Sequence, residues 1–272
     1  MKHLNCRDLK IYLKSKDRFK TDNGIISIKS HLDSCRTCWK KWNRFRWDLS
    51  KDSQGFKELQ EYLGRSFRWY FDASWALAEE WKRKNPKSFI EIEKFYKHSK
   101  NYLYSLTLWH ESGDRKSYLE DFVRLDKKIN IDSCLDYGCG IGSDGLRMLD
   151  LGKKIYFYDF DNPSIRFLRW RLKKRNKKAV TLCVGKTKRF PRVDLIWVVD
   201  VLEHMVDPTE ALDAISNKTK VFVHVSQFGE KRGGRHPFHF EFNTRILNRA
   251  LLRKKFILSD ESFSNLNVWI KR

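Results

Sequence analysis

The chain has 272 residues, 41% of them hydrophobic and 33% charged, and its 56 lysines and arginines against 34 acidic residues give a formal net charge of +22. This length allows one main domain with an appendage, and the composition is that of a globular protein. No apolar run approaches the about 20 residues that span a bilayer, and the first ten residues are unlike a signal peptide, so we expect a cytoplasmic protein without a membrane span. The charge favours polyanionic partners such as a nucleic acid, or it serves only solubility.

Residues 1–50 are basic, show apolar residues at helical spacing and hold three of the six cysteines. His31, Cys35 and Cys38 follow the order H-x3-C-x2-C, which puts three potential ligands on adjacent helical turns, and Cys6 supplies a fourth. Three thiolates and one imidazole suit a tetrahedral zinc ion. This spacing resembles that of the zinc-binding anti-sigma fold.

We therefore predict a structural zinc in a helical module of residues 1–50, because so short and basic a segment has little apolar core with which to fold alone. His3 competes with Cys6 for the fourth position. The alternative interpretation is that Cys35 and Cys38 are ordinary helix residues.

Residues 51–128 show helical spacing throughout, with aromatic stripes that include Phe67, Phe71 and Trp75, and almost no strand pattern. They predict a helical linker or cap region. Aromatic residues such as Tyr102 and Trp109 could cap a pocket, although core packing explains them equally well.

Short β-rich runs alternate with helical patterns only after residue 128, so we predict a third domain over residues 129–272. Strand-helix alternation indicates a parallel sheet covered by helices on both faces, and the last two runs lie close together as a terminal hairpin would. The predicted strands are IDSCLDY (131–137), KIYFYDF (154–160), AVTLCV (179–184), VDLIWVVD (193–200), KVFVHVS (220–226), KFILSD (255–260) and NVWIKR (267–272).

The loop after the first of these strands reads DYGCGIG, with glycines at 138, 140 and 142 just before a helical stretch. Glycine allows a sharp turn and close approach of a ligand to the backbone, and the helix supplies N–H groups. The pattern differs from the dinucleotide fingerprint G-x-G-x-x-G, so no phosphate is demanded. The second strand ends at Asp159, where an acid can accept hydrogen bonds from ribose hydroxyls. A tight turn alone is the simpler explanation of the glycines, but it does not explain the acid.

Three motifs in order, LDYGCGIG, YFYDFDNPS and VDLIWVVDVLEHMVDP, resemble those of class I S-adenosylmethionine-dependent methyltransferases. The resemblance covers about half of the chain and implies a Rossmann-like seven-stranded sheet. It implies that Asp136 lies near the methionine amino group of the cofactor, that the loop makes backbone contacts with it and that Asp159 holds its ribose. The cofactor-binding residues it implies are Asp136, Gly138, Cys139, Gly140, Gly142, Asp159, Phe160 and Asp200. An acid that family members often use for the adenine has no clear match near VGKTKRF.

The motif VVDVLEHMVDP places Asp200, Glu203 and His204 at the end of a strand, where open α/β sheets bind ligands. It resembles the LEH version of the family, which includes ubiquinone-biosynthesis O-methyltransferases, and a similar set with a later histidine occurs in small-RNA 2′-O-methyltransferases. RHPFHFEFN supplies two later histidines, His236 and His239. We predict Glu203, His204 and His239 as catalytic residues. Two acids and two histidines of this region could bind Mg²⁺ or a similar hard metal at the acceptor, or a histidine could act as a metal-free general base, or the side chains could serve only for packing.

Two segments combine cations with aromatic residues: SIRFLRWRLKKRNKK (164–178) and CWKKWNRFRW (38–47). Both are typical of surfaces for phosphates and stacked bases, although a solvated helix face and helix packing are the ordinary explanations. The remaining cysteines, Cys134, Cys139 and Cys183, are expected to be buried thiols.

The sequence thus predicts a methyltransferase that acts on an oxygen or nitrogen of a small-molecule or anionic acceptor. One alternative is an RNA methyltransferase that uses a metal for 2′-O-methylation. The other is an inactive protein that binds the cofactor or uses zinc for interaction.

Overall fold

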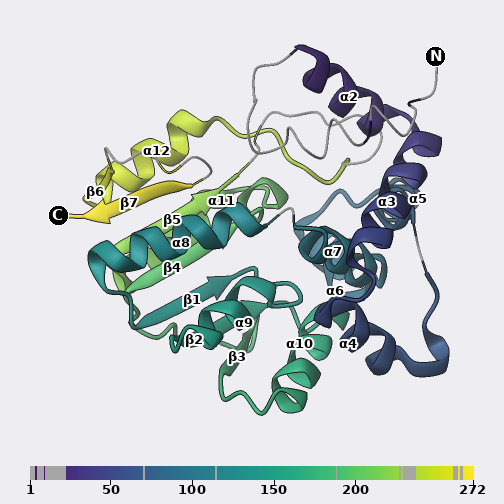
Figure 1. Ribbon diagram of the computed structural model, residues 1–272. Coiled ribbons are helices and arrows are strands. Elements are labelled where there is room, and N and C mark those ends of the chain that lie inside the picture. The colour runs from purple at the N-terminus through teal and green to yellow at the C-terminus, as the bar shows by residue number, and fades with distance from the viewer. Residues whose placement is uncertain are drawn as a thin grey trace. The chain divides into compact units, whose positions relative to one another are not determined.

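The structure is a computed structural model. It describes residues 4, 9, 23–69, 71–113, 115–187, 189–226, 228, 237–259, 263 and 266–272, which are drawn as ribbon in Figure 1. These residues fall into two compact units, which are described separately below. The first unit takes its described residues from 1–86, 100–114 and 231–238, and the second takes them from 87–99, 115–230 and 239–272.

The first unit is helical, as predicted. Its helices are α2 (Asn23–Ser34), α3 (Arg36–Ser50), α4 (Gln54–Leu63), the 3-10 turn η1 (Gly64–Ser66), α5 (Ala73–Lys84) and α7 (Asn101–Glu111). Leu32, Cys38 and Trp42 form a buried cluster where α2 meets α3. This cluster gives the N-terminal segment an apolar core of its own.

The aromatic stripe around residue 70 is not helical, contrary to the sequence prediction. The described residues from Phe67 to Asp72 lie between η1 and α5 in irregular backbone. The helix α4 ends at Gly64, whose φ of +49° is a left-handed conformation that glycine adopts at low cost. Asp72 then stands at the N-cap position of α5. Aromatic spacing alone therefore misled the prediction, because it ignored the glycine that ends the helix.

The second unit contains a seven-stranded sheet in the order β3-β2-β1-β4-β5-β7-β6. Strands β1 to β5 are parallel, and β7 runs antiparallel to both β5 and β6. All seven predicted strands and the terminal hairpin are confirmed. The strands are β1 (Ser133–Tyr137), β2 (Lys154–Asp159), β3 (Val180–Cys183), β4 (Leu195–Val199), β5 (Val221–Val225), β6 (Phe256–Leu258) and β7 (Asn267–Lys271).

Helices cover both faces of this sheet, and Figure 1 shows α8 lying across one of them. One core joins the sheet to α8 (Lys116–Ile129), α9 (Ser143–Asp150) and α10 (Pro163–Lys174). The opposite core joins it to α11 (Pro208–Ile215) and α12 (Thr244–Arg253). The other helical elements are α6 (Phe89–His98) and the 3-10 turns η2 (Leu202–His204) and η3 (Ser216–Lys218). This is the predicted Rossmann-like architecture with a helical N-terminal extension.

The order of the strands reverses between β1 and β4, which lie side by side at the centre of the sheet. In open α/β sheets, ligands bind outside the carboxyl ends of the strands at such a reversal. The loops that follow β1 and β4 carry the glycine motif and the LEH motif, so the fold brings both motifs to one edge. In the described part of the chain, no helix has the length and apolar character that crossing a membrane requires.

Candidate active site

The glycine loop joins β1 to α9 and has little room for side chains. Gly138 and Gly142 both have a φ of +71°, in the left-handed region that favours glycine. A Cβ atom at Gly138 would lie 2.4 Å from the Val201 side chain, and one at Gly142 would lie 2.4 Å from Leu168. Packing within the protein itself therefore excludes a side chain at both positions, in addition to any ligand that the loop binds.

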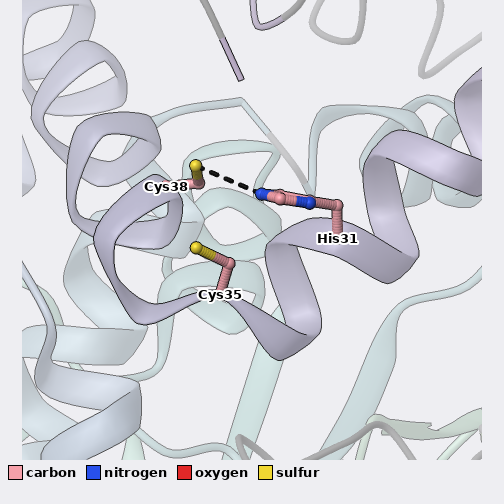
Figure 2. Close-up of side chains that lie close together, drawn as sticks. All are labelled: His31, Cys35 and Cys38. Atoms are coloured by element: carbon pink, nitrogen blue, oxygen red, sulfur yellow. Dashed lines mark hydrogen bonds between the residues drawn. The ribbon is translucent and has the colours of Figure 1, made fainter. Parts of the chain in front are cut away.

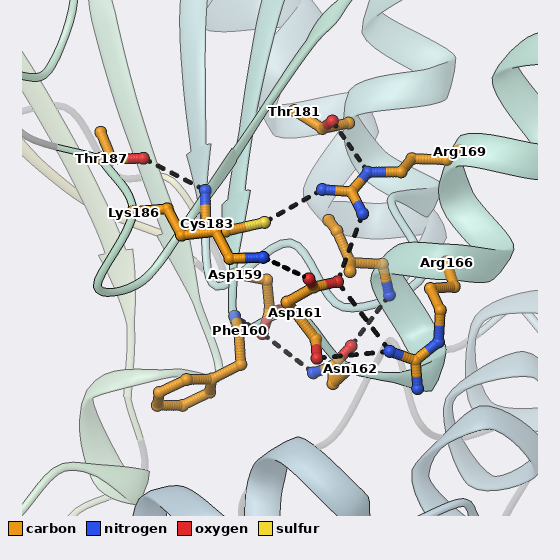
Figure 3. Close-up of polar contacts among 11 residues, drawn as sticks. Asp159, Phe160, Asp161, Asn162, Arg166, Arg169, Thr181, Cys183, Lys186 and Thr187 are labelled. Carbon is orange, nitrogen blue, oxygen red and sulfur yellow. Dashed lines mark hydrogen bonds and ion pairs between the residues drawn. The ribbon is translucent and has the colours of Figure 1, made fainter.

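Asp159, at the end of β2, holds this loop in place. Its Oδ2 accepts a hydrogen bond from the Gly140 N–H at 2.7 Å. Its Oδ1 accepts from the Phe160 N–H at 2.6 Å and from the Asn162 amide at 3.2 Å (Figure 3). Burial raises the pKa of Asp159 to about 6, although these hydrogen bonds oppose the shift. A carboxylate has about four acceptor positions, so a ribose hydroxyl can still bind beside these three donors.

Asp136, at the end of β1, is buried beneath the start of α9. Its Oδ2 accepts a hydrogen bond from the Gly145 N–H at 3.2 Å. Burial, together with repulsion from Asp144, raises the pKa of Asp136 to about 8. A cation beside this carboxyl group would favour its ionised form.

An ion-pair network that the sequence analysis missed lies next to Asp136. The Arg115 guanidinium contacts Asp144 and lies 3.5 Å from an Asp200 carboxylate oxygen, while Trp197 Nε1 donates to Asp144 at 3.0 Å. Burial disfavours the charged guanidinium, but attraction to the two acids outweighs it and raises the pKa of Arg115. Asp144 stands in the first turn of α9, next to the glycine motif, where it could have been noticed. Nothing in the sequence marks Arg115.

The excess of acid over base is the main electrostatic feature of this region. Asp136, Asp144, Asp159 and Asp200 gather around the glycine loop, with Arg115 as the cation paired to two of them. Asp200, which the sequence analysis assigned to the cofactor, has an unusual φ of +54°. Such a region suits a ligand that carries positive charge.

The LEH motif forms η2, and its histidine, His204, lies next to His239. The rings of His204 and His239 lie edge to face, with centroids 4.6 Å apart. Glu203 is only 1% exposed, and its carbonyl oxygen accepts a hydrogen bond from the Phe240 N–H at 2.7 Å. This bond ties the segment of His239 to η2. His236, the other histidine considered for this place, lies outside the described residues.

Tyr96 of α6 also contacts His204, and nothing in the sequence indicated this contact. Its hydroxyl lies 3.3 Å from His204 Nδ1, and its ring is stacked on Phe160 with centroids 6.1 Å apart and planes 4° from parallel. Phe160 follows directly after Asp159. One tyrosine thus links the predicted cofactor-binding residue Phe160 to the predicted catalytic residue His204.

The end of β3, where the family's adenine-binding acid was sought, instead carries a network of cations (Figure 3). Asp161 pairs with Arg166, Arg169 and Lys186, and Arg169 also donates to the Cys183 sulfur at 3.0 Å. Cys183 is buried, as are Cys134 and Cys139, so the expectation of buried thiols is confirmed. Among the cations of α10, Arg171 is buried and donates to the Ile141 carbonyl in the glycine loop at 2.8 Å.

His31, Cys35 and Cys38 come together in the first unit, as Figure 2 shows. One ligand atom of each lies within 4.8 Å of the other two, and His31 Nε2 is 3.2 Å from Cys38 Sγ. Cys35 stands at the N-cap of α3, between the helices that carry the other two. Cys6 and His3, the predicted candidates for a fourth ligand, lie outside the described residues.

Among the described residues, no other group of three or more potential metal ligands comes as close together as this trio. The ligand atoms of Asp200, Glu203, His204 and His239 do not converge in this way. Burial raises the pKa of Cys38, while a hydrogen bond from the Leu4 N–H to its sulfur at 3.3 Å acts in the opposite direction. A bound cation would stabilise the thiolate against this cost of burial.

Comparison with known proteins agrees with the fold. Residues 135–220 match a family model described as a methyltransferase domain. An S-adenosylmethionine-dependent methyltransferase from Clostridium acetobutylicum has a similar structure, with 13% identity and a TM-score of 0.50 over 58% of this chain and 92% of that one. None of the curated proteins has a sequence that matches this chain.

Two further solved structures are similar at lower TM-scores. Magnesium protoporphyrin IX methyltransferase from Synechocystis, with S-adenosylmethionine bound, has 13% identity and a TM-score of 0.46 over 85% of this chain and 97% of that one. The methyltransferase domain of a bacterial protein, CtHen1-C, has 17% identity and a TM-score of 0.45 over 58% and 98%. The sheet order and the glycine loop between β1 and α9 agree with the match over residues 135–220, and together they lead to one conclusion: this chain carries a methyltransferase domain.

Proposed function

We propose that the protein is an enzyme that transfers a methyl group from S-adenosylmethionine to an oxygen or nitrogen of a small-molecule or anionic acceptor. His204 would act as the general base. The observation that carries this proposal is the contact of His204 with both the Tyr96 hydroxyl and the His239 ring. A general base is most effective when a neighbouring group orients it, and the pKa of histidine suits proton transfer near neutral pH. The acceptor would lose its proton to His204 as its heteroatom attacks the methyl group.

The cofactor would lie across the glycine loop, with its methionine part towards Asp136 and Asp200 and its ribose on Asp159. The charge of the region supports this placement, because S-adenosylmethionine carries a sulfonium and an ammonium group and the site is rich in carboxylates. The cofactor supplies the activated methyl group. Backbone groups of Gly138, Cys139, Gly140 and Gly142 and the ring of Phe160 would hold it in position.

The surroundings of Glu203 and His204 favour a metal-free base over a bound Mg²⁺. Mg²⁺ demands near-octahedral oxygen ligands, usually with several waters. Glu203 is almost fully buried, and His204 Nδ1 already faces the Tyr96 hydroxyl. The RNA-methylating alternative with a catalytic metal would require these side chains to rearrange.

The experiment that tests the proposed function incubates the purified enzyme and isotopically labelled S-adenosylmethionine with cell extract. We expect label in products that can be separated into nucleic acid, protein and small-molecule fractions and identified by mass spectrometry. Calorimetric titration with unlabelled cofactor serves as the companion measurement. Tight cofactor binding without labelled product in any fraction would instead favour the inactive cofactor-binding protein.

We also propose that His31, Cys35 and Cys38 hold a structural zinc ion, with Cys6 as the fourth ligand. The convergence of three ligand atoms supports it. The purified protein is expected to contain about one zinc per chain, and Cys35→Ser to lose most of it, because tetrahedral structural sites depend on all of their ligands. Elemental analysis under reducing conditions measures both. Cys134→Ser, at a buried thiol of the second unit, is the control that should retain its zinc.

A further inference from the structure

Three aromatic side chains form a continuous, partly exposed surface on the first unit. The ring centroids of Trp47 and Trp69 are 5.4 Å apart, those of Trp69 and Phe71 are 5.2 Å apart and those of Trp47 and Phe71 are 5.9 Å apart. Trp69 also packs on Phe56, which is fully buried, so the surface is attached to the core. We refer to Trp47, Trp69 and Phe71 as the aromatic surface.

The segment of Trp69 and Phe71 is fixed beside α3. The side-chain amide of the buried Asn43 donates a hydrogen bond to the Phe71 carbonyl oxygen at 2.6 Å. The irregular backbone after η1 therefore presents its rings next to those of the helix. Rings that are held by the core lose little conformational freedom when a ligand stacks on them.

Cations frame the aromatic surface. The Arg44 guanidinium lies 5.5 Å from the centre of the Trp47 ring and 5.1 Å from that of Phe71, and Lys51 Nζ lies 5.7 Å from the centre of the Trp47 ring. Arg44 and Lys51 are exposed, as are Lys40 and Lys41 of the same helix. Asp48 is the acidic residue of α3, and it reaches Arg44 only at 3.8 Å. Lys40 pairs with Asp72 at 3.5 Å, but the two cations that lie over the rings outnumber Asp48.

The other basic segment, on α10, differs in its contacts. Arg166 and Arg169 pair with Asp161, and Arg171 is buried against the glycine loop. Internal partners therefore account for these three arginines, and Lys174 of the same helix lies over the single ring of Trp170. Arg44 and Lys51 differ because the partly exposed rings over which they lie belong to a group of three.

We propose that the aromatic surface, with Arg44 and Lys51, binds single-stranded nucleic acid. Bases would stack on the rings of Trp47 and Phe71, and phosphates would meet the two cations that now lie over those rings. Proteins that bind single strands combine such rings with a basic groove. An anionic membrane fits less well, since this side of α3 exposes lysines, arginine and an acid rather than aliphatic residues that would enter the bilayer. The inference concerns the first unit and does not rest on the proposed transfer reaction.

The test measures binding of the full-length protein to fluorescein-labelled oligouridylate and oligothymidylate of 12 nucleotides by anisotropy at several salt concentrations. The double variant Arg44→Ala/Lys51→Ala is expected to bind at least about tenfold more weakly. In a plot of the logarithm of the binding constant against the logarithm of the salt concentration, the slope for the variant should be smaller in magnitude by about 1.4. This difference corresponds to two phosphate contacts on a single strand. The matched control is Lys82→Ala/Arg83→Ala, which removes two exposed cations from the end of α5 and should change affinity less than threefold.

A second variant tests stacking separately from charge. Trp47→Leu is expected to weaken binding at least about fivefold, the lower end of what one stacked base contributes. Its zinc content and its affinity for S-adenosylmethionine show whether the protein is folded. Equal weakening in the two double variants, equally tight binding of a 12-base-pair duplex, or binding to phosphatidylserine vesicles without binding to either oligonucleotide would each overturn the proposal.

Discussion

His204→Ala is expected to lower methyl transfer by about 100- to 10,000-fold, which is the range that a positioned general base contributes. The reason is that His204 contacts both the Tyr96 hydroxyl and the His239 ring, and the two contacts together orient its imidazole. Affinity for S-adenosylmethionine should change little, because the cofactor is assigned to the loop after β1 and the end of β2. Single-turnover rates with labelled cofactor and calorimetry measure the two quantities.

Two milder variants make this prediction sharper. Tyr96→Phe keeps the stacking on Phe160 and removes only the hydroxyl that faces His204, so its transfer rate should fall less than that of His204→Ala. Glu203→Gln tests the buried acid without deleting its volume. If His204→Ala and His239→Ala both lose cofactor binding in proportion to activity, the histidines have a structural role and the assignment of a base is wrong.

Asp159→Ala is expected to weaken binding of S-adenosylmethionine by more than a hundredfold. Hydrogen bonds to a charged group contribute about 1.5–3 kcal/mol each, and about 1.4 kcal/mol corresponds to a factor of ten. The variant loses the proposed bonds to ribose and also the bond from Asp159 to the Gly140 N–H, which holds the glycine loop. Calorimetric titration measures the loss.

The chain offers a matched control two residues away. Asp161 is a carboxylate of the same segment, but it pairs with Arg166, Arg169 and Lys186 instead of the loop. Asp161→Ala should therefore leave the affinity for the cofactor within about threefold of the original value. Similar losses in both variants would show that the segment as a whole, and not the Asp159 carboxylate, determines binding.

The parts of this fold that could be predicted from the sequence are those that depend on residues close together in the chain. The seven strands follow β-rich runs, and the loop of Gly138 and Gly142 follows from glycines between a strand and a helix. Both are short-range features, in which neighbouring residues carry the whole signal. The convergence of His31, Cys35 and Cys38 is also local, since the three lie within eight residues.

The contacts that could not be predicted depend on tertiary packing. Arg115 precedes β1 by 18 residues and meets Asp144 and Asp200 only when the sheet has formed. Tyr96 reaches His204 from a helix 108 residues earlier in the chain. Phe71 was assigned to a helix because its spacing is helical, although the glycine at 64 ends that helix. For Arg115 and Tyr96 the deciding partner lies outside the window in which a local pattern can be read, whereas Gly64 lies inside that window and was overlooked.

The protonation of Asp136 has a consequence for the catalytic cycle. Its pKa of about 8 means that the carboxyl group is mainly protonated in the free enzyme at neutral pH. If the methionine end of the cofactor lies beside it, the incoming positive charge would lower this pKa and expel the proton. Methyl transfer removes the sulfonium charge but leaves the ammonium group that would lie beside Asp136, so the carboxylate would stay ionised in the product complex. The proton would return when the spent cofactor leaves, and each round of cofactor binding and release would therefore move a proton out of and back into this buried site.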